Sequence, residues 1–198
     1  FPKYVPPAQT DPSRLEDIPL QIAASGPDTD HSSIMQAYFA AITNARKRIR
    51  IVSPYLILNE SLLMAIKTAA MSGVRVQIIL PGKPDHLIVW WGGRSYYREL
   101  MEAGVRIYEY QNGFLHSKVL IVDDEVLSIG TANMDLRSFN HNFEVTAMVY
   151  HPATVAKALE QFEADLLMSR EVDLVKLQHR NIFSRTMESV CRLFSPVL

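Results

Sequence analysis

Cysteine, long apolar runs and net charge are all scarce in this sequence, and each absence removes a class of protein. The single cysteine, Cys191, leaves no internal disulfide, and no pair of cysteines or histidines stands at the spacing of a structural zinc site. No apolar run is long enough to span a bilayer, and the chain opens without a signal-peptide pattern. The net charge of −1 lacks the positive field of a dedicated duplex-binding protein, so we expect no nucleic-acid partner.

The residues that are present suit one packed domain with less regular ends. Of the 198 residues, 48% are hydrophobic, which is ordinary for a globular core. Residues 1–30 hold six prolines and no helical periodicity, so we interpret them as a proline-rich interdomain linker or entry arm. We expect the folded domain over residues 31–170 and an amphipathic C-terminal helix over residues 171–198. Because the chain starts at Phe1 and not at methionine, we also expect it to be a piece of a longer protein.

The order of helical and strand patterns predicts the fold class. Ile34, Tyr38 and Ile42 recur at the spacing of one helical face. Strand, helix and strand patterns then follow in "RIRIVSPYL", "NESLLMAIKTAAMSG" and "VRVQIILPG", with Asn59 available as a helix cap, and "KPDHLIVWWGGRS" is a looser stretch after them. Because this order forms a parallel strand pair with a right-handed crossover, we expect an α/β fold with a mixed, mostly parallel β-sheet flanked by helices on both faces.

A charged stretch, "HSKVLIVDDEVLSIGTAN", begins an otherwise apolar strand at His116. Side chains in a strand alternate between faces, so His116 and Lys118 point to the same side, about 6.6 Å apart. The acidic turn around Asp124 predicts a hairpin, in which residue 116 lies opposite residue 132. The loop 130–133 therefore returns beside His116, and residues that are distant in the sequence form one site.

The residue types of this site suit a phosphate. Lys118 offers a fixed positive charge, and Thr131 and Asn133 offer neutral donors. Gly130 lets the backbone approach closely. His116 can attack phosphorus or protonate a leaving alkoxide, because the pKa of histidine lies near neutrality. A lysine about 4 Å from the phosphate contributes roughly 4 kcal/mol at an effective dielectric of about 20, so we expect no metal and no other cofactor.

The spacing H-x-K-x4-D-x6-G-[ST]-x-N, which this sequence meets without a gap, resembles the signature of the phospholipase D superfamily. The residues that meet it are His116, Lys118, Asp123, Gly130, Thr131 and Asn133. Further stretches between residues 20 and 170 resemble the C-terminal half of bacterial cardiolipin synthases: "ASGPD", "IVSPY", "RSYYRELMEAGVRIYEYQNGFLHSK" and "MDLRSFNHNFEV". The resemblance implies that residues 31–170 form a phospholipase D-like catalytic half-domain with one motif.

The resemblance also implies roles for these residues. Two such motifs meet at one active site, where one histidine forms a phosphohistidine and the other protonates the departing alcohol. The implied catalytic residues are His116, Lys118, Asp123, Asn133 and Glu144. The implied phosphate ligands are Lys118, Gly130, Thr131 and Asn133. Glu144 accepts a hydrogen bond from the motif histidine in this scheme, whereas Asp123, at a strand-to-turn junction, has a second interpretation as an organiser of the local backbone.

One copy of the motif is present, because no other histidine has a lysine two positions further on. The resemblance therefore implies a partner, either an N-terminal half of the same protein or a second copy of this chain related by a twofold axis. The implied substrate is an anionic phospholipid, phosphatidylglycerol, at a membrane surface. We expect the full-length protein to be associated with the inner membrane of a bacterium and this part alone to be soluble.

Three classes of function remain open. The first is phosphatidyl transfer between two phosphatidylglycerol molecules, which yields cardiolipin and glycerol. The second is a single-motif, homodimeric phosphodiesterase or nuclease, although the net charge of −1 disfavours the basic groove that a polyanion needs. The third is an isolated half-domain without activity of its own. The pair Trp90 and Trp91 and the basic, apolar tail favour transfer at a membrane, although both could instead pack on the domain.

Overall fold

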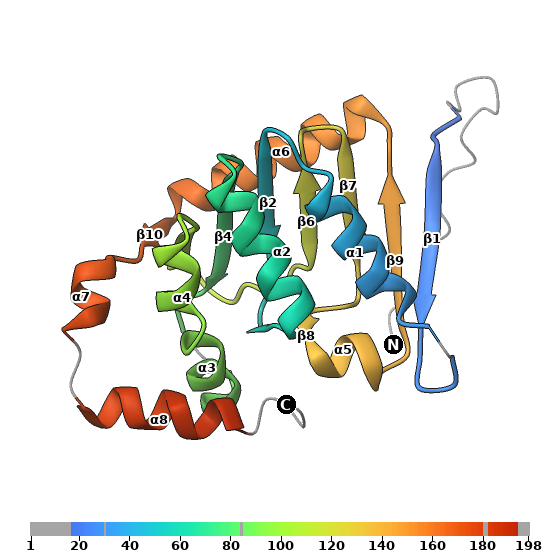
Figure 1. The fold of residues 1–198 in the computed structure, drawn as a ribbon. Helices are drawn as coiled ribbons and strands as arrows, with labels where there is room; N and C mark the ends of the chain where they lie inside the picture. The colour runs from blue at the N-terminus through green and yellow to red at the C-terminus, as the bar shows by residue number, and fades with distance from the viewer. Residues whose placement is uncertain (1–16, 30, 84, 180–181, 194–198) are drawn as a thin grey trace, which may run out of the picture.

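The structure is a computed structural model that describes residues 17–29, 31–83, 85–179 and 182–193. Its strands are β1 (Leu20–Ser25), β2 (Arg48–Val52), β3 (Leu56–Ile57), β4 (Arg75–Pro81), β5 (Arg106–Tyr110), β6 (Val119–Val122), β7 (Val126–Gly130), β8 (Met134–Asp135), β9 (Glu144–Val149) and β10 (Ser169–Glu171). Its helices are α1 (Ser33–Thr43), α2 (Glu60–Met71), α3 (Leu87–Arg94), α4 (Tyr97–Glu102), α5 (Leu136–Asn140), α6 (Pro152–Leu167), α7 (Leu174–Gln178) and α8 (Ile182–Leu193). An eight-stranded sheet in the order β1-β9-β7-β6-β2-β4-β5-β10 forms the centre, and β3 and β8 form a small second sheet at one end (Figure 1).

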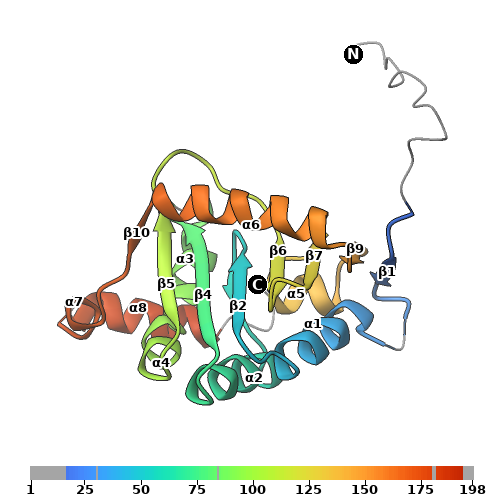
Figure 2. The same cartoon turned by 90° about the horizontal axis from the view of Figure 1, so that it is seen from above.

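Helices cover both faces of the large sheet, as Figure 2 shows from above. Helices α1, α2 and α4 lie on one face, and α6 lies on the other. Buried strand residues alternate between the two cores: Ile78 of β4 joins the core under α1 and α2, and its neighbour Ile79 joins the core that contains Phe162 of α6. Because the central strands are covered on both faces, their sequences are continuous apolar runs.

Local signals in the sequence explain where the first two helices form. Ile34, Tyr38 and Ile42 are all buried along α1, as their helical spacing predicted. The Asn59 side chain accepts a hydrogen bond from the Leu62 N–H (2.8 Å) and so caps α2. These two helices and the strands that flank α2 are therefore confirmed.

The predicted α/β class, with a mixed sheet and helices on both faces, is confirmed, but the expected majority of parallel strands is wrong. Among the described strands of the large sheet, β2–β4 and β4–β5 pair in parallel, and the other five neighbouring pairs are antiparallel. The parallel pairs are those joined by helical crossovers. After β5 the chain adds strands through a hairpin and reversing connections, which give antiparallel pairs. The expected majority of parallel pairs rested on a single strand–helix–strand pattern in the sequence, and that pattern does not extend to these strands.

The two ends of the chain and the stretch 83–95 form more regular structure than expected. Residues 20–25, inside the expected entry arm, form β1 and pair with β9 at the sheet edge, while residues 1–16 lie outside the described residues. The tail holds two helices, α7 and α8, in place of one, and residues 194–198 lie outside the described part. The stretch 83–95 contains α3, in which Gly93 packs against the backbone of β3. There tertiary packing outweighs the weak helical propensity of glycine.

The tail helix α8 packs against α3 and α4 through charged and aromatic contacts. Glu188 Oε1 lies 4.0 Å from Arg94 Nε, and Arg192 Cζ lies 4.5 Å from the centroid of the Tyr96 ring. The structure thus shows the described part of α8 docked on the domain. Within the described residues, no helix combines the length and the apolar character needed to cross a bilayer. The division into arm, half-domain and tail stays a prediction.

Candidate active site

The strand directions bring several polar segments to one end of the large sheet, the lower end in Figure 1. Strands β2 and β4 run in parallel toward this end, where Tyr55 and Asp85 follow them. Strand β6 runs antiparallel to β2, so His116 precedes it at the same end. Strand β7 ends there and β9 begins there, which adds the loop 130–133 and Glu144. The carboxyl ends of parallel strands are a common place for ligand sites.

The β6–β7 hairpin has the register that the sequence predicts. The Gly130 N–H donates to the Lys118 carbonyl oxygen (3.4 Å), which continues the antiparallel pairing of the two strands. The paired residues, from Val119–Ile129 to Val122–Val126, have the offset that the sequence predicts. The predicted register is therefore confirmed for the two strands, and the loop 130–133 returns to the end of the sheet where His116 lies.

His116 and Lys118 lie in the segment just before β6. The His116 ring is stacked on Phe114, with ring centroids 5.2 Å apart and planes 19° apart. Burial and the charge of Lys118 lower the pKa of His116, and Asp85 acts in the opposite direction. Lys118 Nζ donates to the His116 carbonyl oxygen (2.7 Å). Burial lowers the pKa of Lys118 as well, against the effect of nearby carboxylates, of which Glu144 acts most strongly.

Glu144 opens β9 at this end without contacting the histidine ring. Its Oε1 accepts a hydrogen bond from Asn142 Nδ2 (3.1 Å), and within the described residues no hydrogen bond joins Glu144 to His116. Its negative charge acts on Lys118 across the site. The implied role of Glu144 in orienting the His116 ring therefore stays a prediction.

Gly130 and Thr131 face β9. A Cβ on Gly130 would lie 2.4 Å from the Val145 carbonyl oxygen, so only glycine permits this approach of β7 to β9. Thr131 Oγ1 accepts a hydrogen bond from the Val145 N–H (3.0 Å), and the Thr131 N–H donates to the Val145 carbonyl oxygen (2.9 Å). These strand-to-strand contacts occupy the groups that were expected to bind phosphate. The structure thus gives Gly130 and Thr131 a role in the framework of the sheet, and their role as phosphate ligands stays a prediction.

Asp123 lies at the other end of the hairpin from His116. Its carboxylate accepts hydrogen bonds from the N–H groups of Arg46, Lys47 and Arg48 at 2.7, 2.7 and 2.8 Å. Burial acts against ionisation, but these hydrogen bonds hold the pKa of Asp123 below its usual range. These contacts agree with the second interpretation of Asp123, as an organiser of the local backbone between α1 and β2, and its catalytic role stays a prediction.

Replacing Asp123 by alanine is expected to lower stability and to leave the chemistry intact. The change removes three hydrogen bonds to a partly exposed carboxylate and places alanine at a φ of 55°, for a combined loss of roughly 2 kcal/mol. Thermal unfolding is then expected about 4–8 °C lower, while turnover per folded enzyme stays within about twofold of the wild type. Asp123→Asn, which keeps an acceptor and tolerates this backbone, is the matched control. Lost turnover at unchanged stability would support a catalytic role for Asp123 instead.

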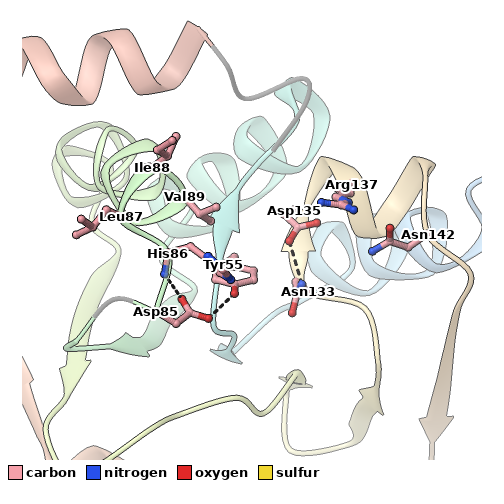
Figure 3. A pocket seen from close by; sticks show the side chains of 10 residues that line it. All are labelled: Tyr55, Asp85, His86, Leu87, Ile88, Val89, Asn133, Asp135, Arg137 and Asn142. Atoms are coloured by element: carbon pink, nitrogen blue, oxygen red, sulfur yellow. Dashed lines mark hydrogen bonds between the residues drawn. The ribbon is translucent and has the colours of Figure 1, made fainter.

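A pocket of about 720 Å³ opens beside these residues, between the start of α3 and the segment that leads into α5 (Figure 3). It is lined by Tyr55, Asp85, His86, Leu87, Ile88, Val89, Asn133, Asp135, Arg137 and Asn142. Figure 3 shows the first six on one wall and the last four on the opposite wall. The charges of Asp85 and Asp135 both act on Lys118, so the lysine lies within electrostatic range of the pocket, although it is not one of the lining residues. Its volume is typical of a small-molecule site.

Six polar residues of the pocket are absent from the predicted site: Tyr55, Asp85, His86, Asp135, Arg137 and Asn142. The Tyr55 hydroxyl donates to Asp85 Oδ2 (2.5 Å), and the His86 N–H donates to Asp85 Oδ1 (2.8 Å). Burial acts against ionisation of Asp85, but these hydrogen bonds hold its pKa below the usual range. Burial and the Asp85 carboxylate raise the pKa of Tyr55. The first three residues follow the ends of β2 and β4, and that position is the signal that could have found them.

Asp135 is deeply placed, with 4% of its surface exposed. Its Oδ1 accepts a hydrogen bond from the Ser138 N–H (2.6 Å) at the start of α5, and its Oδ2 accepts one from Asn133 Nδ2 (3.0 Å). Burial raises the pKa of Asp135, although both hydrogen bonds act in the opposite direction. Asn133 Oδ1 is buried and has no hydrogen-bond partner among the described residues. Such an atom costs about 1–3 kcal/mol unless a donor reaches it, so a ligand donor is favoured there.

The site offers cationic side chains in place of a metal-ligand set. In the part of the chain that the structure describes, no group of three or more histidine, cysteine or acidic side chains is placed to hold a metal ion. Positive charge comes from Lys118 and from Arg137 at the pocket. The arrangement can therefore bind an anion at Lys118, present acceptors to a ligand in the pocket and use His116 as nucleophile or acid.

Comparison with protein families and curated proteins gives one consistent result. The family model described as cardiolipin synthase, PLD-like domain, matches residues 38–166. The chain is 46% identical over 197 residues to the cardiolipin synthase of Halalkalibacterium halodurans, covering 100% of this chain and 39% of the relative. It is 43% identical over 195 residues to the major cardiolipin synthase ClsA of Bacillus subtilis, covering 98% and 40%. The chain thus spans about two fifths of the length of these relatives.

Solved structures share the fold at low sequence identity. A phospholipase D family member, Nuc from Salmonella typhimurium, superposes with a TM-score of 0.67 at 20% identity, covering 79% of this chain and 99% of that one. Phosphatidylserine synthase from Haemophilus influenzae gives a TM-score of 0.72 at 16% identity, covering 91% of this chain and 46% of that one. At these identities the likeness concerns the fold alone.

Proposed function

Because this chain belongs to the cardiolipin synthase, PLD-like domain family, we propose that it supplies one half of a phosphatidyltransferase site. In this reaction one phosphatidylglycerol gives its phosphatidyl group to a hydroxyl of a second, and cardiolipin and glycerol are formed. The observation that carries the proposal is the position of His116, Lys118 and Asn133 at one end of the sheet, beside a pocket with polar walls. Identity to cardiolipin synthases over nearly the whole chain supports this transfer over other phosphodiester reactions.

The reaction proceeds through a phosphohistidine in two displacements. In the first, a histidine nitrogen attacks phosphorus, a P–N bond forms, and the bond from phosphorus to the glycerol oxygen breaks. The departing alkoxide takes a proton from the histidine of the second motif. The lowered pKa of His116 favours the neutral imidazole, which suits the attacking role.

The second displacement reverses these proton and bond changes. A hydroxyl of the second phosphatidylglycerol gives its proton to the histidine that acted as acid, and its oxygen attacks phosphorus. The P–N bond breaks and the nucleophilic histidine is regenerated. Charge builds on the non-bridging oxygens in both steps, and in this proposal Lys118 and the Asn133 amide stabilise both transition states.

The second motif comes from outside this chain in the proposed enzyme. The chain carries one H-x-K motif and spans about two fifths of its curated relatives, which supports an N-terminal half of the same protein as the partner. A second copy of this chain is the alternative, because a twofold axis also brings two motifs together.

The substrate requires that the assembled enzyme work at a membrane surface. Phosphatidylglycerol is an anionic lipid that stays in the bilayer, so we place the full-length protein at the bacterial inner membrane. Leu87 and Ile88 support an approach to lipid, because they are 64% and 56% exposed at the rim of the pocket. Exposed apolar side chains beside a pocket are common at lipid-contacting surfaces.

A product assay with the full-length enzyme tests the proposal. Vesicles of phosphatidylglycerol are expected to yield cardiolipin and free glycerol in equal amounts, with unchanged rates in excess EDTA because Lys118 supplies the positive charge. Phosphatidic acid as the main product would replace the transferase with a hydrolase. Loss of activity in EDTA that zinc restores would contradict charge stabilisation by lysine.

A further inference from the structure

The pocket beside Lys118 presents hydrogen-bond acceptors from both of its walls (Figure 3). An ionised carboxylate has about four acceptor positions. Asp85 receives two hydrogen bonds from the protein, from Tyr55 and from the His86 N–H, and Asp135 on the facing wall also receives two. Each carboxylate therefore keeps acceptor capacity for a ligand.

Asn133 adds a further acceptor beside Asp135, on the wall that faces Asp85 (Figure 3). Its Nδ2 donates to Asp135 Oδ2, and this contact fixes which end of the amide is the oxygen. Its Oδ1 is buried and has no partner among the described residues. A ligand hydroxyl that donates to this oxygen removes the cost of leaving it unpaired.

These acceptors determine which chemical class of ligand the pocket favours. A phosphodiester anion carries acceptors and no donors, so it cannot satisfy the acceptors of the pocket, and the groups that attract it are Lys118 and Arg137. An ammonium group is less favoured than two carboxylates alone would suggest, because Arg137 lines the same pocket. A neutral group with several hydroxyls satisfies the acceptors without adding charge.

We propose that this pocket is the subsite for the polyol of the acceptor alcohol, with Asp85, Asn133 and Asp135 accepting hydrogen bonds from neighbouring hydroxyls. The inference rests on the proposed function and deepens it, since it names the group that distinguishes a glycerol head group from water or a simple alcohol. The phosphorus lies at Lys118 and the polyol lies in the adjoining pocket.

A competition between acceptors tests the subsite in the full-length enzyme. The enzyme is loaded from phosphatidylglycerol vesicles in equal concentrations of deuterated glycerol, propan-1-ol and ethanolamine, and the lipid products are separated by mass. All products form from the same loaded histidine, so their ratio is independent of the rate of loading. The wild type is expected to favour glycerol over both other alcohols.

Asp135→Asn and Asp85→Asn are each expected to lower the ratio of glycerol to propan-1-ol transfer by at least about tenfold, which is about 1.4 kcal/mol of discrimination. Asp135→Asn keeps an oxygen for the Ser138 N–H, so the start of α5 is retained. Asp173→Asn is the matched control, because Asp173 likewise caps a five-residue helix, α7, but does not line the pocket. Its ratio is expected to stay within about twofold of the wild type.

The possible outcomes distinguish a failure of the subsite proposal from a failure of the proposed reaction. An unchanged ratio in both pocket variants, or a wild-type preference for ethanolamine, overturns the polyol subsite while phosphatidyl transfer stands. An equal fall for all acceptors, water included, also overturns it, because the carboxylates then act on catalysis in general. Absence of transfer in the wild type defeats the proposed function instead. A fall in deuterated glycerol and cardiolipin products together indicates that the pocket binds the polyol whether free or attached to lipid.

Discussion

His116→Ala is expected to abolish phosphatidyl transfer in the assembled enzyme, with turnover reduced about a thousandfold or more. In the proposed reaction, alanine removes either the nucleophile that forms the phosphohistidine or the acid that protonates the departing glycerol. The His116 ring is exposed and stacked on Phe114, so its loss costs little packing and the fold is expected to survive. The rate of cardiolipin formation from phosphatidylglycerol vesicles, measured beside thermal unfolding, gives both quantities.

His31→Ala is the matched control for this loss. His31 is also exposed, but it lies before α1 and outside the motif, so its replacement is expected to change turnover by less than about twofold. Turnover of His116→Ala within about tenfold of the wild type would remove His116 from the chemistry, since such a loss is smaller than that of a catalytic histidine.

Lys118→Met is expected to lower kcat/KM by about a thousandfold. Methionine keeps much of the side-chain length and removes the charge, which at about 4 Å from phosphate contributes roughly 4 kcal/mol at an effective dielectric of about 20. Lys157→Met, on the exposed side of α6, changes the net charge equally and is expected to leave kcat/KM within about twofold. Unchanged kcat/KM in Lys118→Met would refute the stabilising role of the lysine.

The same variant is expected to shift the pH profile. Burial and the positive charge of Lys118 lower the pKa of His116, so removal of that charge raises the pKa toward its ordinary value. Asp85, which acts to raise the pKa of His116, remains in place. If His116 is the nucleophile, the acidic limb of kcat/KM therefore moves to higher pH in Lys118→Met. A limb that does not move would place a group other than His116 in control of it.

The hairpin and the position of its histidine could be predicted from the sequence because they depend on local interactions. An acidic turn between two apolar runs set the register, and that register returned the loop 130–133 to the end of the sheet where His116 lies, without knowledge of the rest of the fold. The Asn59 cap and the helical spacing of Ile34, Tyr38 and Ile42 were equally local signals. Such signals can be recognised in the sequence because each involves residues a few positions apart.

The hydrogen-bond partners of Asp123 and Thr131 could not be predicted from the sequence because they lie on other strands or connections. Asp123 is held by the N–H groups that lead into β2, 75 to 77 positions away, and Thr131 is held by Val145 of β9. Strand order decides both contacts, and the sequence signals favoured a parallel sheet where most pairs are antiparallel. A motif position therefore does not reveal whether its side chain faces the substrate or the framework.

The sequence by itself determined the chemistry proposed for this protein: a histidine, a lysine and an asparagine that one hairpin brings to the same end of the sheet. The tertiary structure decided which neighbours surround them, since the pocket is formed by residues after β2, after β4 and after β7 that meet only once the strands are ordered. The physical reason is the range of the interactions. Turn, cap and strand signals act over a few residues. The electrostatic field and the hydrogen bonds at a site, in contrast, come from every segment that the sheet places beside it.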